Sequence, residues 1–256
     1  MKYELTVIVP GIRDENWERL YNEATLASKR YTLEFIFVGP RPPNPTLMAK
    51  HNVKYIKDFG TPTRSLHIGT LIAEGQYFTW LADDAWVYEE SLDSAMDLLM
   101  HRDPKKDMIG IRYSEGTNHS GACPPDVYWT SNHHPNFHLP GIDRDYAICG
   151  VLLMDLDFYN YMGGLDCAYE HVNMNVHDFA IRAQRNGSHL YMSPHLVMNC
   201  DFEPNRTPQN SPVIAAYVEN DDPLFRKHYA VMGERPLRID INNWKQTEPV
   251  WRRRFS

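Results

Sequence analysis

Hydrophobic residues in the first third of the chain gather into short continuous runs, separated by segments whose apolar residues recur at helical spacing. The runs are "LTVIVPG" (5–11), "LEFIFVG" (33–39), the more amphipathic "VKYIKDF" (53–59) and "QYFTWLA" (76–82). Continuous apolar runs of this length, rich in β-branched and aromatic residues, predict buried strands.

The segments between these runs predict helices. One helix follows Asp14, which is placed to cap it, a second runs from Arg64 to Glu74 and is stopped by Gly75, and a third is "EESLDSAMDLLMH" (89–101). Buried strands that alternate with helices predict a mostly parallel sheet covered on both faces.

The second half of the chain has a less regular pattern. "DMIGIRY" (107–113) and "YAICGVLLMDL" (146–156) predict strands, and "VHDFAIRAQRNG" (176–187) predicts a helix that ends at its glycine. The polar segment 114–144 is rich in Gly, Pro and His, and it is predicted to be a loop that orders over the substrate.

Composition narrows the class of protein. The 256 residues show no linker, so we expect a single domain over 1–256, with halves at 1–110 and 111–210 and a C-terminal extension at 211–256. A formal charge of −7 argues mildly against a dedicated nucleic-acid binder. The longest apolar run, "ICGVLLM" (148–154), is far shorter than the roughly 20 residues of a membrane-spanning helix.

The four cysteines and the N-terminus indicate the compartment. The cysteines are widely spaced with no CxxC pair, which favours free thiols in a cytoplasmic protein, and two disulfides are the alternative. The N-terminus lacks a signal-peptide pattern because Lys2 and Glu4 lead directly into a strand.

Two adjacent carboxylates, Asp83 and Asp84, follow the fourth predicted strand in "YFTWLADDAWV" (77–87). Adjacent carboxylates repel each other and do not belong in a core. In parallel α/β sheets, ligands bind outside the carboxyl ends of the strands, where this pair lies. Such a pair suits Mg²⁺ or Mn²⁺, which takes one or two carboxylates together with substrate phosphates. The alternative is a turn with a solvated Asp pair.

The order of these motifs resembles that of inverting family 2 glycosyltransferases with the GT-A fold. The matching features of the first half are a strand that ends at Pro10, a helix with Arg64 and Gly69 that closes on "AEG" (73–75), and the acidic "LADDA". In the second half, "GGLD" (163–166) is followed by "HDFAIR" (177–182), as an "ED" precedes "L-x-x-R" in that family.

The resemblance implies a GT-A (Rossmann-like) α/β fold, with a mixed, mostly parallel sheet flanked by helices. It implies transfer of a hexosyl or pentosyl group, with inversion, from a nucleotide-sugar donor to an acceptor hydroxyl, assisted by Mg²⁺ or Mn²⁺. The acceptor is left open among a glycan, a lipid-linked sugar, a protein and a modified nucleic-acid base. The implied roles are general base for Asp178, metal ligands for Asp84 and His195, and nucleotide-sugar contacts for Pro10, Asp58, Arg64 and Asp83.

Each role has a plainer alternative. Asp178 is also suited to cap a helix, and Asp58 to be a solvated residue at a strand end. An unliganded His195 is the commoner case for a histidine at a strand end. If Asp178 is not the base, Asp166 and Glu170 are the next candidates.

The sequence also departs from the family pattern. Gly39 and Pro40 stand where the family often has acids that contact the nucleotide, Ala82 replaces the first acid of a DxD motif, and His177 replaces the usual Glu. These departures keep open a non-catalytic nucleotide- or sugar-binding module of the same fold. A sugar-nucleotidyltransferase is a third reading, but its Gly-rich basic loop is poorly matched by "PGIRDEN" (10–16).

Overall fold

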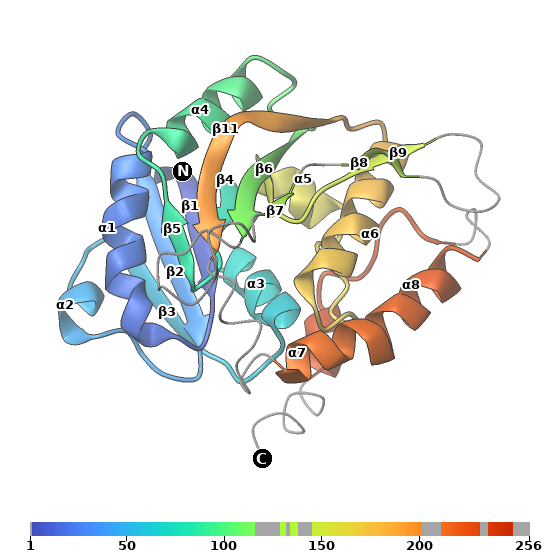
Figure 1. Cartoon of the computed structure of the whole chain (residues 1–256), viewed down its shortest axis with the longest axis horizontal. Helices are drawn as coiled ribbons and strands as arrows, with labels where there is room; N and C mark the ends of the chain where they lie inside the picture. The colour runs from blue at the N-terminus through green and yellow to red at the C-terminus, as the bar shows by residue number, and fades with distance from the viewer. Residues whose placement is uncertain are drawn as a thin grey trace.

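Four parallel strands form one side of the central sheet in the computed structural model, which describes residues 2–115, 129–131, 134–137, 145–200, 211–230 and 235–247. In spatial order they are β3 (Val53–Lys57), β2 (Leu33–Gly39), β1 (Tyr3–Pro10) and β4 (Gly75–Trp80). Every residue of β2 is buried, as expected for a strand covered on both faces. The carboxyl ends of all four strands therefore lie at one edge of the sheet (Figure 1).

The sheet continues beyond β4 with strands of mixed direction. Next to β4 are antiparallel β10 (Leu152–Asp155), then β6 (Met108–Glu115), β11 (Leu190–Cys200) and β5 (Ala85–Val87). A short β7 (Trp129–Ser131) also pairs with β6, and β8 (His134–Phe137) pairs with β9 (Tyr146–Ile148) in a separate ribbon. The predicted mixed, mostly parallel sheet of an α/β domain is confirmed.

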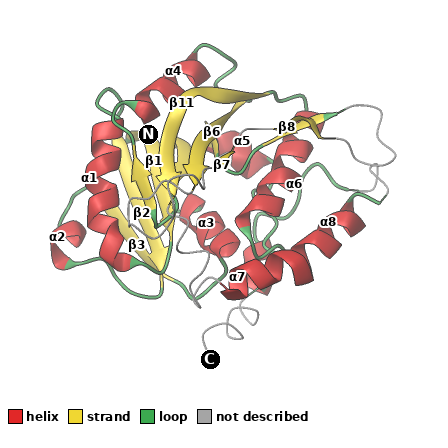
Figure 2. Ribbon diagram, in the orientation of Figure 1, coloured by secondary structure: helices red, strands yellow, loops and turns green. Residues whose placement is uncertain are grey.

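Helices flank the sheet, as Figure 2 shows. The described helices are α1 (Trp17–Ala27), α2 (Pro45–Met48), α3 (Pro62–Thr70), α4 (Ser91–Met100), α5 (Leu156–Tyr161), α6 (Val172–Arg185), α7 (Ser211–Ala216) and α8 (Asp222–His228). Helix α3 packs against β1 and β2 and also contacts α6, so it lies between the two halves of the chain. Helices α6, α7 and α8 gather beyond it in Figure 1.

Three predicted boundaries were wrong. The helix predicted over Arg64–Glu74 ends at Thr70, because the next three amides bond to carbonyls three residues back and the Glu74 amide donates to Glu34 Oε2 (2.8 Å). The strand predicted over 146–156 is divided into β9 and β10. Helix α6 begins at Val172, earlier than predicted, where His171 caps it by accepting from the Asn173 amide.

Other predictions from the sequence fall partly outside the described residues. Most of segment 114–144 lies there, and so does Cys123. Cys149, Cys167 and Cys200 are buried free thiols, which agrees with the thiol interpretation for these three. Among the described residues, none of the helices has the length and apolar character needed to cross a bilayer.

Residues 235–247 are here called the C-terminal strap, and they pack against the loop between α5 and α6. Its Ile239 amide donates to the Met162 carbonyl (3.2 Å), beside Gly163. Gly163 has a positive φ of 81°, and a Cβ there would collide with the Ile239 backbone. The strap therefore lies directly on the loop that joins α5 to α6.

Candidate active site

Asp83 fixes the turn after β4 to the turn after β1. Its Oδ2 accepts from the amides of Ile12 (2.8 Å) and Arg13 (2.9 Å), and its Oδ1 pairs with the Arg13 guanidinium. Gly11 makes this approach possible, because a Cβ at position 11 would overlap the Asp83 side chain. Asp83 is therefore buried and bonded to backbone amides, and the interpretation as a solvated turn residue is wrong for it.

Asp84, the predicted metal ligand, follows in the turn between β4 and β5 and is half-buried. In the part of the chain that the structure describes, no three His, Cys, Asp or Glu side chains lie together as a ready-made metal site. One carboxylate still fits Mg²⁺ or Mn²⁺ if substrate phosphates and water complete the coordination. The residues present therefore suit a cation that arrives with a diphosphate.

His195 is not brought to Asp84. It lies within β11 rather than after a strand, and it is exposed. Cys200, at the end of the same strand, pairs with Ala85, which directly follows the turn that holds Asp83 and Asp84, here called the acidic turn. Five residues of strand span about 16 Å, so His195 lies well away from the acidic turn, and its role as a ligand stays an untested prediction.

Asp58 and Arg64, two residues predicted to contact the nucleotide, form an ion pair between the end of β3 and the first turn of α3. Arg64 Nε lies 3.2 Å from each Asp58 carboxylate oxygen, and Nη2 lies 3.1 Å from Oδ1. Only 11% of the Asp58 side chain is exposed, so Asp58 is not a solvated strand-end residue. Thr61 caps α3 and Pro62 occupies its first turn, which fixes the start of the helix that carries Arg64.

The strap covers this pair through Trp244. The Trp244 carbonyl accepts from Arg64, and the guanidinium carbon of Arg64 lies 4.9 Å from the centroid of the indole ring. This is a favourable placement of a cation over an aromatic face. A residue near the end of the chain thus lies beside the pair predicted to contact the nucleotide.

The sequence departure at Gly39 has a steric cause. Gly39 lies at the end of β2, and a Cβ there would overlap the Gly11 carbonyl oxygen. The Gly11 amide also donates to the Val38 carbonyl (3.0 Å), so the ends of β1 and β2 are closely joined. An acidic side chain does not fit at this position.

His67 is buried and links α3 to the strap and to α5. Its Nε2 lies 2.9 Å from the Ile241 carbonyl oxygen and its Nδ1 lies 2.8 Å from the Tyr159 hydroxyl. A carbonyl can only accept, so Nε2 carries the proton and Nδ1 accepts from Tyr159. Burial lowers the pKa of His67 to about 4, which keeps the ring neutral at pH 7.

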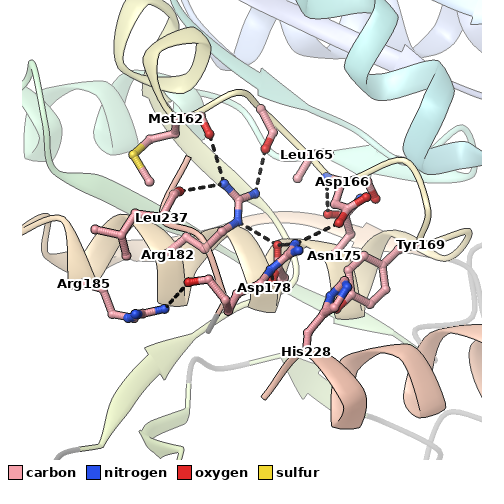
Figure 3. Close-up of polar contacts among 12 residues, drawn as sticks. Met162, Leu165, Asp166, Tyr169, Asn175, Asp178, Arg182, Arg185, His228 and Leu237 are labelled. Carbon is pink, nitrogen blue, oxygen red and sulfur yellow. Dashed lines mark hydrogen bonds and ion pairs between the residues drawn. The ribbon is translucent and has the colours of Figure 1, made fainter. Parts of the chain in front are cut away.

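Asp178, the predicted base, lies inside α6 at the centre of a buried polar cluster (Figure 3). Its Oδ2 accepts from Arg182 Nε and Arg235 Nη2, and its Oδ1 accepts from Arg235 Nε and the Tyr229 hydroxyl, all at 2.8 Å. The helix-cap interpretation is wrong, because the helix starts at Val172.

The electrostatics of this cluster keep Asp178 ionised. Burial opposes the charged carboxylate, but Arg182 and Arg235 together outweigh that effect and hold the pKa of Asp178 far below its ordinary value. Arg182 also donates to the carbonyls of Met162 and Gly164, at 3.2 and 2.7 Å. The cluster therefore joins α6, the strap and the loop after α5.

Asp166, in that loop, is the second carboxylate that Arg235 contacts. Arg235 Nη2 lies 2.9 Å from Asp166 Oδ2, and the Ala168 amide donates to Asp166 Oδ1 at 3.0 Å. The Asn175 side chain accepts from the Asp166 amide and donates to the Asp166 carbonyl, both at 3.0 Å. Asp166 is thus held at both its backbone and its carboxylate.

The structure brings Pro10 and Asp83 to one edge of the sheet, with Asp84 in the same turn as Asp83. It pairs Asp58 with Arg64 after β3, at the same edge. Sequence reasoning missed Arg235, Trp244 as an Arg64 partner, and His67. "ERPLRID" (234–240) has neither periodicity nor a motif, so the sequence carried no signal for Arg235. The three consecutive arginines of "WRRRF" (251–255) lie outside the described residues.

The structure is similar to that of S. aureus TarS, with 16% sequence identity and a TM-score of 0.53 over 86% of this chain. It is also similar to TarS 1–349 in complex with UDP, with 16% identity and a TM-score of 0.50 over 85% of this chain. The chain therefore has a GT-A-like α/β fold, with the strand order β3-β2-β1-β4 and two aspartates in the turn after β4.

The two similarities cover 40% of the first TarS structure and 66% of the second. The chain therefore matches only part of TarS, and at this level of identity the likeness establishes the fold. No protein-family model and no curated protein matches the sequence.

Proposed function

We propose that this protein transfers a sugar from a nucleotide-diphosphate sugar to an acceptor hydroxyl, with inversion at the anomeric carbon. The observation that carries the proposal is the gathering of Pro10, Asp83 and Asp84 at the carboxyl end of the sheet, in a fold shared with a structure solved with UDP. The Asp58–Arg64 pair lies at the carboxyl end of β3, at the same edge. Ligands of open α/β sheets bind at this edge.

In the proposed complex the nucleotide lies against Asp58 and Arg64, and its diphosphate reaches the turn that holds Asp84. Mg²⁺ or Mn²⁺ held there would offset the charge of the leaving diphosphate. Asp83 acts from within the protein by fixing the turn after β1 against the acidic turn. His195 as a further ligand is the weakest part of the proposal, because of its distance along β11.

An inverting transfer requires a base that takes the proton of the attacking hydroxyl, and the proposal places an aspartate of segment 163–178 in that role. Asp178 as this base stays a prediction, and its contacts favour a supporting role, since both oxygens are taken by arginines and a tyrosine. A cytoplasmic location is also part of the proposal, supported by the buried free thiols.

The test is turnover of nucleotide sugars by the purified protein. Release of UDP or GDP from a panel of UDP- and GDP-sugars would be followed with Mn²⁺ or Mg²⁺ and with EDTA. We expect metal-dependent release from at least one donor and its loss in Asp84→Ala. Asp157→Ala, an exposed aspartate at the start of α5, is the matched control and is expected to keep the wild-type rate.

A non-catalytic nucleotide-binding module is the second candidate, favoured by the sealed position of Asp178. It predicts that UDP or GDP binds in calorimetry while no donor in the panel is cleaved at any metal concentration. Binding together with cleavage would exclude this candidate. The absence of both would exclude the two candidates together.

A further inference from the structure

The two aspartates that contact Arg235 differ in their access to a substrate. The Asp178 side chain is 0% exposed and the Asp166 side chain is 14% exposed. A general base must come within hydrogen-bond reach of the proton that it takes. Asp178 presents no surface for such an approach.

Hydrogen bonding separates the two carboxylates in the same way. Each Asp178 oxygen already accepts two hydrogen bonds, which uses the roughly four lone-pair sites of a carboxylate. From the residues that the structure describes, each Asp166 oxygen accepts one hydrogen bond, Oδ1 from the Ala168 amide and Oδ2 from Arg235. Asp166 therefore keeps lone pairs for a further donor, while its position is fixed by Asn175.

The loop that carries Asp166 also adjoins the residues proposed to bind the nucleotide. The amide of Cys167, the next residue, donates to Asn243 Oδ1 at 2.7 Å, and Asn243 precedes the Trp244 that contacts Arg64. In the same loop, a Cβ on Gly164 would touch the ring of His67 from α3. Asp166 thus lies at the junction of the two halves, where donor and acceptor would meet.

We infer that Asp166 is the proton-accepting carboxylate of the proposed transfer, and that Asp178 is a positioning residue that holds Arg235 and Arg182. This inference rests on the proposed function. The acceptor oxygen forms a bond to the anomeric carbon as the bond from that carbon to the diphosphate oxygen breaks. The bonding pair leaves with the nucleoside diphosphate, and the hydroxyl proton passes to an Asp166 oxygen and then to solvent.

The first test compares Asp166→Asn with wild type in cleavage of the active UDP- or GDP-sugar, with water as acceptor. Asparagine keeps the shape of the side chain and can still accept from Ala168. We expect kcat to fall by about 10²-fold or more, with UDP or GDP affinity in calorimetry within about threefold of wild type. Asp157→Asn is the matched control, with unchanged rate.

Chemical rescue separates a base from a structural carboxylate. Added formate is expected to restore part of the cleavage rate in Asp166→Ala, because a small carboxylate can occupy the vacated position and take the proton. It is expected to restore none in Asp178→Ala, whose site is closed to solvent. Rescue confined to Asp178→Ala, or wild-type cleavage by Asp166→Asn, would overturn the inference.

Chemical labelling of the wild-type protein tests the inference without depending on whether a variant folds. Carbodiimide coupling to glycine ethyl ester, read by mass spectrometry, is expected to modify Asp166 and leave Asp178 unmodified. Modification of Asp178 at the faster rate would overturn the inference. A wild-type protein that cleaves no donor would instead refute the proposed function and the inference with it, whereas cleavage that persists in Asp166→Asn refutes the inference alone.

Discussion

The guanidinium of Arg235 reaches both carboxylate oxygens of Asp178, with Nε 2.8 Å from Oδ1 and Nη2 2.8 Å from Oδ2. Both side chains are buried, and 56 residues lie between them along the chain. A bidentate contact of this kind is strong and specific in geometry. It fixes the C-terminal strap onto α6 beside Asp166, which Arg235 also contacts.

Loss of Arg235 is expected to destabilise the protein strongly. Arg235→Met removes one partner of a buried ion pair, and such changes cost roughly 3–5 kcal/mol. Urea denaturation would measure the change in the free energy of unfolding. Arg226→Met removes an exposed arginine that pairs with Asp222 on α8, and it is expected to change the free energy of unfolding far less, because solvent screens the pair. Equal effects of the two substitutions would contradict the buried role of Arg235.

The neutral state of His67 is expected to make stability depend on pH. The folded protein lowers the pKa of His67 to about 4, mainly through burial, whereas the unfolded chain binds the proton near pH 6.5. The contribution of the neutral His67 to the free energy of unfolding is therefore fully present above about pH 6.5, and it is lost as the pH falls toward 4. By linkage the loss from this one group amounts to about 3 kcal/mol.

A His67→Gln variant isolates this effect. His171, with a pKa lowered to about 4 by burial, and Asp221, with a pKa raised to about 6 by burial, titrate in the same range in both proteins. The difference between wild type and variant therefore reports His67. Melting temperatures between pH 4 and 7 should fall less steeply in His67→Gln, and parallel curves would refute the assignment.

Substitutions of the two adjacent aspartates of the acidic turn are expected to have different effects, on stability for Asp83 and on ligand binding for Asp84. Asp83→Ala leaves the amides of Ile12 and Arg13 without their carboxylate partner, which costs roughly 1–3 kcal/mol. Asp84→Ala should abolish Mn²⁺-dependent UDP or GDP binding. Chemical denaturation measures stability and calorimetry measures binding. Loss of binding in Asp83→Ala and loss of stability in Asp84→Ala would show that the two roles are assigned the wrong way round.

Restoring a family-like acid at position 39 is expected to harm the protein. A side chain in Gly39→Asp would overlap the Gly11 carbonyl, and overpacking of this kind costs about 1–3 kcal/mol. Pro40→Asp introduces the same carboxylate one residue later, where the side chain is only half-buried, and serves as the control. Tighter UDP binding by a stable Gly39→Asp protein would show that the steric explanation is wrong.

Most of the sheet could be predicted from the sequence because its strands are buried on both faces. Continuous apolar runs located β1 and β4 to within about two residues, and β2 was predicted at its observed bounds. The ends of the helices could not be predicted as well from the sequence. Beyond the early end of α3, the Glu74 amide donates to Glu34, which is remote in sequence.

The candidate site could be predicted in part, for a related physical reason. Parallel strands place their carboxyl ends at one edge, so Asp83 and Asp84 could be assigned to it from the position of the fourth strand. The roles of Asp58 and Arg64 came from the family resemblance, and their ion pair was not predicted. The surroundings of Asp178 could not be predicted. Arg235 and Tyr229 come from irregular or weakly patterned segments, and only the fold brings them to α6.

The C-terminal strap has a consequence for folding kinetics. Its contact between Arg64 and Trp244 closes a separation of 180 residues, and loop closure of that length costs entropy before any contact is gained. We expect the strap to dock late, after the sheet and α6 have formed. Contacts made after the transition state govern the unfolding rate. Substitutions in the strap should therefore accelerate unfolding and leave the refolding rate almost unchanged.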